Sequence, residues 1–293
     1  MLSILFPEYD TELFRDIHQL SPVLDPAVNG DSIRFIAYVA GVITIVHLLL
    51  LLGVKSFWVN RGGCTDDKKL AYAAAWKASY QLTNLIVNLV LGCLGIYYQA
   101  QVPWDESTTE KIVGYEHVKL FSLGQIGYQL WALPIGIIFI GESKQMIIHH
   151  VAVICVCSTS AFIRCGFRYY TPYFYGLIEI SSVPLSIMNG FKDNKHWIKQ
   201  YPEMYSTVRL VFGCLFLLVR VVLWTPFYWN FFALASMLLY SSEVVSTKII
   251  LALFLIASLV LTFLQYFWAR KIISALVKGP GSEHSAGPTK KIH

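Results

Sequence analysis

Two adjacent histidines, His149 and His150, stand near the start of an apolar run, in the stretch KQMIIHHVAVICV at residues 144–156. A neutral imidazole can act as a general base or as a nucleophile. The pair is therefore the candidate catalytic group, if the protein is an enzyme. The plainer alternative is two polar side chains that mark the edge of a membrane.

A second group of polar side chains lies within other apolar runs, where such groups are costly and usually face the interior of a helix bundle. Spacings of four, three and four residues place four of them on one helix face. These four are Lys77, Gln81, Asn84 and Asn88. The others come from three further runs and are Gln129, Glu179, Ser186 and Arg220. We expect five of these groups to converge near the membrane centre, namely Gln81, Asn84, Gln129, Glu179 and Arg220. They either serve a function there or form hydrogen bonds that merely join helices.

The depth of these groups follows from a helical rise of about 1.5 Å per residue. On this scale Glu179 and Gln129 lie roughly 16 Å from the membrane edge, and Arg220 roughly 20 Å. A Glu179–Arg220 ion pair is therefore expected. The histidines lie only roughly 7 Å deep, so a contact with Glu179 would need a tilted or bent helix.

The elements that must position these groups are membrane-spanning helices. Of the 293 residues, 56% are hydrophobic and only 14% are charged, which is less charge than a soluble domain carries. The fold class expected is all-α, a polytopic transmembrane helix bundle of about seven spans, each of roughly 20 apolar residues. The spans are expected near residues 33–57, 70–98, 117–140, 145–164, 171–190, 206–227 and 247–272. Residues 231–240 extend the sixth span, form a separate half-helix or lie at the interface.

The distribution of Lys and Arg predicts the orientation, because cytosolic loops carry an excess of both. They gather in the first, third and fifth connections and in the C-terminal tail. The predicted layout is an acidic lumenal arm at 1–32, the first span with its cytosolic loop at 33–69, the remaining bundle at 70–278, and a flexible cytosolic tail at 279–293.

The chain ends in KKIH, with Lys290 and Lys291 in the tail that is predicted to be cytosolic. This pattern resembles the dilysine signal that returns membrane proteins to the endoplasmic reticulum through coat proteins, a receptor-read address rather than an anchor. A basic tail near acidic lipid headgroups is the alternative. We expect a multi-pass protein of the endoplasmic reticulum membrane.

Several short motifs occur in an order that resembles the TLC-domain family over roughly residues 70–278. They are GYQLW, IIHH, IEISSVPLSIMN, VRVVLWTPF and LQYFWARKIISALVK. That family includes ceramide synthases, translocating-chain-associating membrane proteins, a cargo receptor of the endoplasmic reticulum and regulators of membrane lipid composition. The resemblance implies a helix bundle in which the His pair and polar groups line a cavity for lipid or acyl chains.

One departure from the ceramide synthases bears on activity. The synthases carry aspartates after the His pair, whereas IEISSVPLSIMN holds Glu179 as its sole acid. The sequence is thus closer to the non-synthase branch, and the first hypothesis is a lipid-handling protein that regulates membrane lipid composition. An acyl-CoA-dependent sphingoid-base N-acyltransferase that uses His149 or His150, and a recycling cargo receptor, remain open as alternatives.

Membrane lipids are the expected partners, with coat proteins at the tail, no nucleic acid, and a homo-oligomer left open. No Cys-x-x-Cys pair or other zinc spacing occurs, so no metal is expected. No cofactor is expected either, and acyl-CoA would enter only as a substrate.

Overall fold

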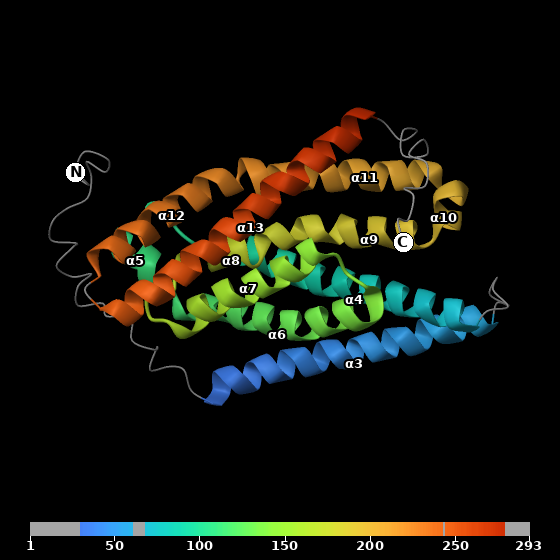
Figure 1. The fold of residues 1–293 in the computed structure, drawn as a ribbon, viewed down its shortest axis with the longest axis horizontal. Helices are drawn as coiled ribbons and strands as arrows, with labels where there is room; N and C mark the ends of the chain where they lie inside the picture. Colours follow the sequence, from blue (N-terminus) through green and yellow to red (C-terminus); the bar gives the residue numbers. More distant parts are fainter. Residues whose placement is uncertain (1–29, 61–67, 243, 279–293) are drawn as a thin grey trace, which may run out of the picture.

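The computed structural model describes residues 30–60, 68–242 and 244–278, and every regular element in these ranges is a helix. Six helical runs are long and apolar enough to cross a membrane. They lie along the long axis of the molecule (Figure 1). The expected all-α bundle is confirmed, and the bounds of most expected spans agree with the helices to within a few residues.

The helical elements are α-helices and short 3₁₀ or π-helical turns. The helices are α3 (Gly30–Asn60), α4 (Lys68–Gln99), α5 (Thr108–Val113), α6 (Lys119–Ile135), α7 (Lys144–Phe162), α8 (Thr171–Phe174), α9 (Ser182–Asp193), α10 (Lys195–Gln200), α11 (Pro202–Leu217), α12 (Trp224–Ser241) and α13 (Val245–Lys278). The short 3₁₀ and π-helical turns are η1 (Glu116–Val118), η2 (Gly136–Ile140), η3 (Arg168–Tyr170), η4 (Leu177–Ser181) and η5 (Leu218–Val222).

The expected fifth span, at 171–190, is not one continuous helix, since it is divided among α8, η4 and α9. It nevertheless runs along α4 in the opposite direction. Near one end Gly95 of α4 meets the backbone of Gly176, and near the other Lys77 of α4 lies 3.7 Å from Asp193. Gly95 and Lys77 are 18 residues apart, or about 27 Å, which is close to the thickness of a bilayer core. The broken segment is not among the six helical runs that qualify as spans by length and composition, so its crossing of the membrane as a seventh span stays a prediction.

The expected sixth span is longer than its predicted range of 206–227. The helical run continues from Pro202 to Ser241, so residues 231–240 extend this span rather than forming a separate segment. The π-helical turn η5 interrupts the run and carries Arg220. A π-turn inserts extra backbone into a helix and is frequent at functional sites.

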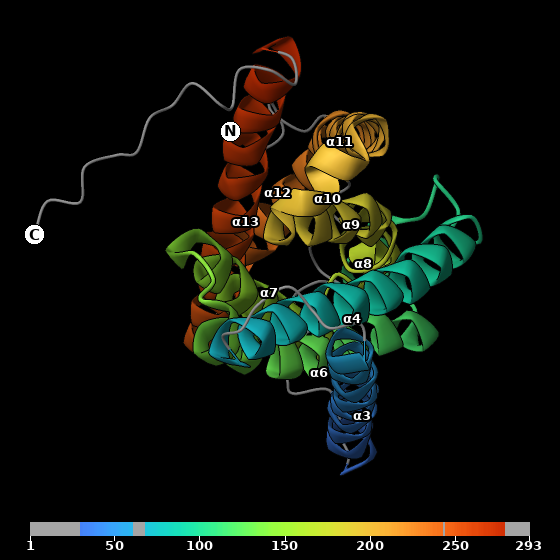
Figure 2. The same ribbon diagram turned by 90° about the vertical axis from the view of Figure 1, so that its right-hand side faces the viewer.

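The connections gather at two ends of the bundle. The α6–α7 connection and α10 lie at one end with the close of α3, whereas α5 and the α12–α13 connection lie at the other (Figure 1). This arrangement brings the Lys- and Arg-rich connections to one end; that this end faces the cytosol stays a prediction from charge. Seen along the bundle, α3 lies at the edge and packs on α4 and α6 (Figure 2).

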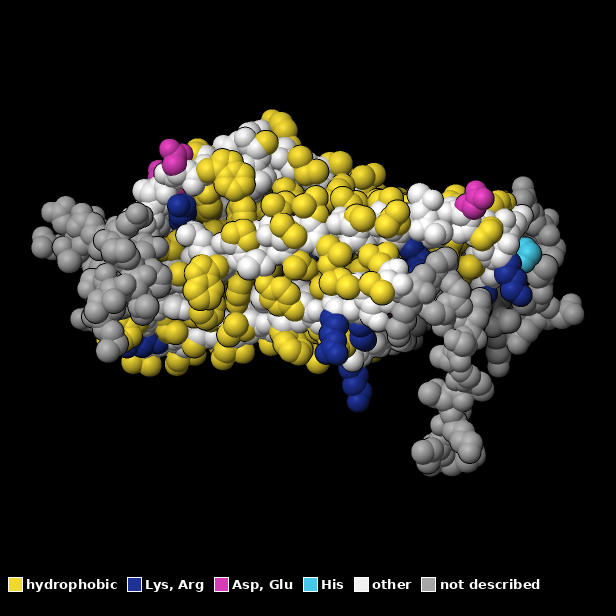
Figure 3. Space-filling model, turned by 90° about the horizontal axis from the view of Figure 1, so that it is seen from above, with side chains coloured by type: hydrophobic (Ala, Val, Ile, Leu, Met, Phe, Trp, Pro, Cys, Tyr) yellow, Lys and Arg dark blue, Asp and Glu magenta, His cyan; other side chains and the backbone are white. Residues whose placement is uncertain are grey.

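Hydrophobic side chains cover most of the face shown in Figure 3, and charged side chains occur there in a few small groups. Inside, aromatic residues fill the half of the bundle near α5. Tyr170, Tyr173, Phe231 and Phe254 are almost completely buried there, and Tyr173 stacks on Phe227 with ring centroids 4.4 Å apart. This half is packed mainly with aromatic rings, and its buried Arg168 is paired with Glu116.

The contact between Gly95 and the broken segment yields a stability prediction. A Cβ on residue 95 would lie 2.0 Å from the backbone nitrogen of Leu177, so Gly95→Ala must push the segment away from α4. We expect a loss of about 1–3 kcal/mol, as for other overpacked interiors, measured by thermal unfolding of the purified protein in detergent. Gly41→Ala on α3 is the matched control, because its Cβ would meet nothing within 4 Å. Equal melting temperatures of the two variants would contradict the prediction.

Candidate functional site

A cavity of about 590 Å³ lies between α4, α6, α7, α9, α11 and α13. The residues that the sequence singled out line this cavity, with the exception of Lys77. They are Gln81, Asn84, Asn88, Gln129, His149, His150, Glu179, Ser186 and Arg220. Lys77 instead lies beside Asp193, where its ammonium joins α4 to the end of α9. The polar faces of separate helices thus share one chamber.

Glu179 and Arg220 form the ion pair expected from their depth. Nη2 of Arg220 donates to Oε2 of Glu179 at 3.1 Å, and both side chains are largely buried. Nε of the same guanidinium donates to the hydroxyl of Ser181 at 2.8 Å, and Nη2 also donates to that of Ser182 at 2.9 Å. The π-turn η5 and the 3₁₀ turn η4 place these groups opposite each other. A buried ion pair is tolerated when further hydrogen bonds satisfy both partners, as they do here.

A chain of hydrogen bonds joins Glu179 to His150 through two glutamines of α6. Gln125 donates from Nε2 to the carbonyl oxygen of Tyr175 at 3.0 Å and to Oε1 of Glu179 at 3.3 Å. Its Oε1 accepts from Nε2 of Gln129 at 3.2 Å. A carbonyl oxygen can only accept, so this orientation of the amides is fixed. Oε1 of Gln129 is therefore an acceptor, and Nδ1 of His150, 2.5 Å away, must be the donor.

The other ring nitrogen of His150 faces an acid that the sequence analysis did not select. Nε2 lies 3.0 Å from Oε2 of Glu142, and Oε1 of Glu142 accepts from the hydroxyl of Tyr80 at 2.6 Å. Because Nδ1 already donates to Gln129, a second proton must lie between Nε2 and the carboxyl group. The acidic partner of the His pair is thus Glu142, which precedes the helix, rather than Glu179.

Two glycines allow Glu142 to fold back into the cavity. Gly141 has a positive φ of 72°, which favours glycine. A Cβ on Gly136 would lie 2.7 Å from the Glu142 carboxyl carbon. Burial acts to raise the pKa of Glu142, but hydrogen bonds with His150 and Tyr80 outweigh it and hold that pKa below its ordinary value. The sequence signal was Gly-Glu-Ser directly before the helix, where Ser143 forms the N-cap.

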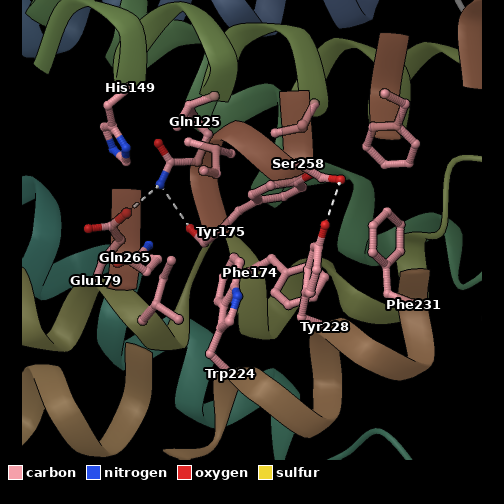
Figure 4. A pocket seen from close by; sticks show the side chains of 15 residues that line it. Gln125, His149, Phe174, Tyr175, Glu179, Trp224, Tyr228, Phe231, Ser258 and Gln265 are labelled. Atoms are coloured by element: carbon pink, nitrogen blue, oxygen red, sulfur yellow. Dashed lines mark hydrogen bonds between the residues drawn. The ribbon is translucent and has the colours of Figure 1, made fainter. Parts of the chain in front are cut away.

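His149 occupies a different position from its neighbour. Its ring meets Trp268 edge-on, with centroids 5.5 Å apart, and its Nδ1 is buried without a hydrogen bond in the described structure. The ring borders both the polar cavity and a narrower pocket of about 40 Å³. Figure 4 shows this second pocket, which extends from His149, Gln125 and Glu179 toward the aromatic half of the bundle.

The protein thus contains two different pockets that share His149 and Glu179 as lining residues. The polar cavity is lined by carboxyl, amide, hydroxyl and cationic groups, whereas the narrow pocket is lined mainly by aromatic and aliphatic side chains. His149 stands at the border. Such an arrangement can hold a molecule with a polar end and an apolar end.

The described residues do not test two of the expectations, the dilysine signal and the lack of a metal. The dilysine pair, Lys290 and Lys291, lies outside the described residues. Among the described residues, no group of three or more His, Cys, Asp or Glu side chains is placed to hold a metal ion.

The buried ion pair predicts strong coupling between its members. Arg220→Met should destabilise the protein by about 3–5 kcal/mol, because the Glu179 carboxylate would remain buried without its partner. Arg220→Met combined with Glu179→Gln should lose less than the sum of the two single losses. Thermal unfolding of all four proteins measures this coupling, and strictly additive losses would contradict it.

Comparison with known proteins adds a family to this geometry. A search of curated proteins gives no match. The sequence model of the TLC domain, however, matches residues 77–274, about two thirds of the 293-residue chain. The matched range includes every residue of the hydrogen-bonded chain from Tyr80 to Arg220 and leaves α3 outside it. The chain belongs to the TLC domain family.

Proposed function

We propose that this protein holds a membrane lipid or an acyl chain in its central cavity and thereby regulates the lipid composition of the membrane in which it resides. Membership of the TLC domain family and the six apolar helices support a lipid-related role in a membrane. The observation that carries the proposal is the polar cavity itself. Its volume of about 590 Å³ lies within the range of small-molecule sites.

Unused polar atoms in the cavity favour a ligand over a purely structural network. Asn88 is only 4% exposed, yet its Oδ1 makes no hydrogen bond in the described structure. Nδ1 of His149 is in the same condition. A buried polar atom without a partner costs about 1–3 kcal/mol. A ligand with hydroxyl, amide or amine groups would form hydrogen bonds with both atoms. A network that only joined helices would not explain why these two atoms have no partner.

The proposed location is the endoplasmic reticulum, with the C-terminus in the cytosol. The support is the KKIH ending together with the excess of Lys and Arg at the end of the bundle to which the C-terminal helix runs. The lipid-handling role also fits the non-synthase branch of the family, because the segment of η4 and α9 has Glu179, on η4, as its acid before the last turn of α9, where the synthases carry aspartates.

The proposal predicts the effect of replacing a polar residue of the cavity lining with an apolar one. Asn88→Leu removes the unbonded acceptor Oδ1 from the cavity lining, so it should weaken lipid retention, and thermal unfolding checks that the variant is folded. We expect less co-purified lipid and a smaller change in cellular lipid composition than with wild type at equal protein level, both read by untargeted lipidomics. The control is Thr44→Val, since Thr44 is an exposed residue on α3 that bonds only its own helix. Identical lipid profiles for Asn88→Leu and wild type would count against the proposal.

A second candidate function, acyl transfer from acyl-CoA to an amine such as a sphingoid base, is favoured by the placement of His149. Both ring nitrogens of His150 are engaged, by Gln129 and Glu142. His149 has a free Nδ1 at the border between the polar cavity and the apolar pocket. In an acyltransferase, His149 would therefore face the thioester as base or acyl acceptor, and His150 would orient the site.

This candidate predicts activity that depends on His149. Purified protein supplied with long-chain acyl-CoA and sphinganine should form N-acylsphinganine, detected by mass spectrometry. His149→Ala should reduce the rate at least about a hundredfold, the loss typical of a missing base, and Cys155→Ala further along α7 serves as a control. Absence of product with acyl-CoAs of every chain length would remove the candidate and leave the binding role.

A further inference from the structure

Two lysines stand at the mouth of the polar cavity. Lys192 is in the last turn of α9 and Lys271 is near the end of α13, and both line the cavity. Both residues are exposed. The Lys271 ammonium lies 4.2 Å from the ring centre of Phe267. Among the described residues, no carboxylate lies within ion-pair distance of either lysine.

The other charged groups of the cavity are already engaged with one another. Arg220 is paired with Glu179, and Glu142 is bonded to His150 and Tyr80. Three cationic side chains and two carboxylates line the cavity, so its formal charge is positive even with neutral histidines. The surplus charge resides on Lys192 and Lys271, which favours a ligand whose charged group is an anion at the mouth.

An apolar groove that adjoins the polar cavity indicates what kind of molecule carries the anionic group. This groove, of about 600 Å³, lies between α3, α4 and α9 and is lined mostly by aliphatic and aromatic side chains. Gln81 and Ser186 border both the groove and the polar cavity. A ligand at this border has an apolar surface on one side and, on the other, the polar cavity whose lining includes Lys192 and Lys271. A phosphate can receive hydrogen bonds from two ammonium groups at once, and lipids that join a phosphate to acyl chains are the main anions of the surrounding bilayer.

We propose that the mouth of the cavity binds the phosphate of an anionic phospholipid, with Lys192 and Lys271 as its cationic contacts and the groove along α3 as the seat of an acyl chain. This inference rests on the proposed lipid-binding function and names the lipid class. It also gives a role to α3, which lies outside the matched family range.

The test uses the full-length protein in phosphatidylcholine nanodiscs that contain a photoactivatable phosphatidic acid, with the reactive group in its acyl chain. Labelling of the protein is quantified by mass spectrometry. Lys192→Glu/Lys271→Glu should reduce labelling about tenfold, since two charge-assisted hydrogen bonds are lost. Lys144→Glu/Lys199→Glu is the matched control, because α10 and the α6–α7 connection lie at one end of the bundle (Figure 1). Lys144 begins α7, Lys199 lies on α10, and neither lines the cavity. Gel filtration and thermal unfolding confirm that both variants are folded.

The outcomes separate this inference from the proposed function. Loss of labelling in the cavity pair alone, with labelled peptides from α3, α4 or α9, supports the inference. Equal loss in both pairs overturns it, since the probe would then report only the charge of the membrane surface. Displacement of the probe by inorganic phosphate or by coenzyme A overturns the lipid assignment in favour of a soluble ligand. Equal labelling by a photoactivatable phosphatidylcholine overturns the anionic class but leaves lipid binding intact. Absence of labelling by either lipid defeats the proposed function itself.

Discussion

The buried pair of Glu179 and Arg220 is the constraint around which this bundle is arranged. Neither charge is stable in an apolar interior alone, so the chain must deliver both to one place and satisfy their remaining hydrogen-bonding groups. The 3₁₀ turn η4 and the π-turn η5 do so, with Ser181 and Ser182 between them. The breaks in the helices follow from this requirement. An unbroken fifth helix would not present Glu179, Ser181 and Ser182 together to one guanidinium.

From this pair a directional chain of hydrogen bonds extends through Gln125 and Gln129 to His150, Glu142 and Tyr80. The orientation of each amide follows from the Tyr175 carbonyl, so the proton on Nδ1 of His150 is decided by a backbone group of the broken segment. Networks of this kind are rigid because each member has one arrangement that satisfies all partners. His149 is left free of the network, and it is the histidine available to a bound molecule.

The two halves of the bundle differ in their interiors. The aromatic half, with Tyr173 and Phe231 among its buried side chains, is a packed interior that holds the helices in register. The other half encloses a polar chamber with surplus positive charge at its mouth. The proposed ligand, with an anionic group at this mouth and an acyl chain in the groove along α3, uses the polar half of the bundle and leaves the aromatic half as packing.

The sequence by itself determined the class of fold, the spans, and most of the cavity. Runs of apolar residues long enough for a bilayer identify the helices, and the spacing of Gln81, Asn84 and Asn88 identifies the face that meets the interior, because both features depend only on local periodicity. The Glu179–Arg220 pair followed from depth along straight helices.

The tertiary structure decided the features that residue spacing and helix depth do not specify. Glu142 enters the cavity because Gly136 and Gly141 let its connection fold back, the close approach of Gly95 and Gly176 lays the broken segment against α4, and the separate roles of His149 and His150 depend on partners from other helices. The periodicity of apolar and polar residues does not specify these features, because they depend on loop geometry and on partners from other helices.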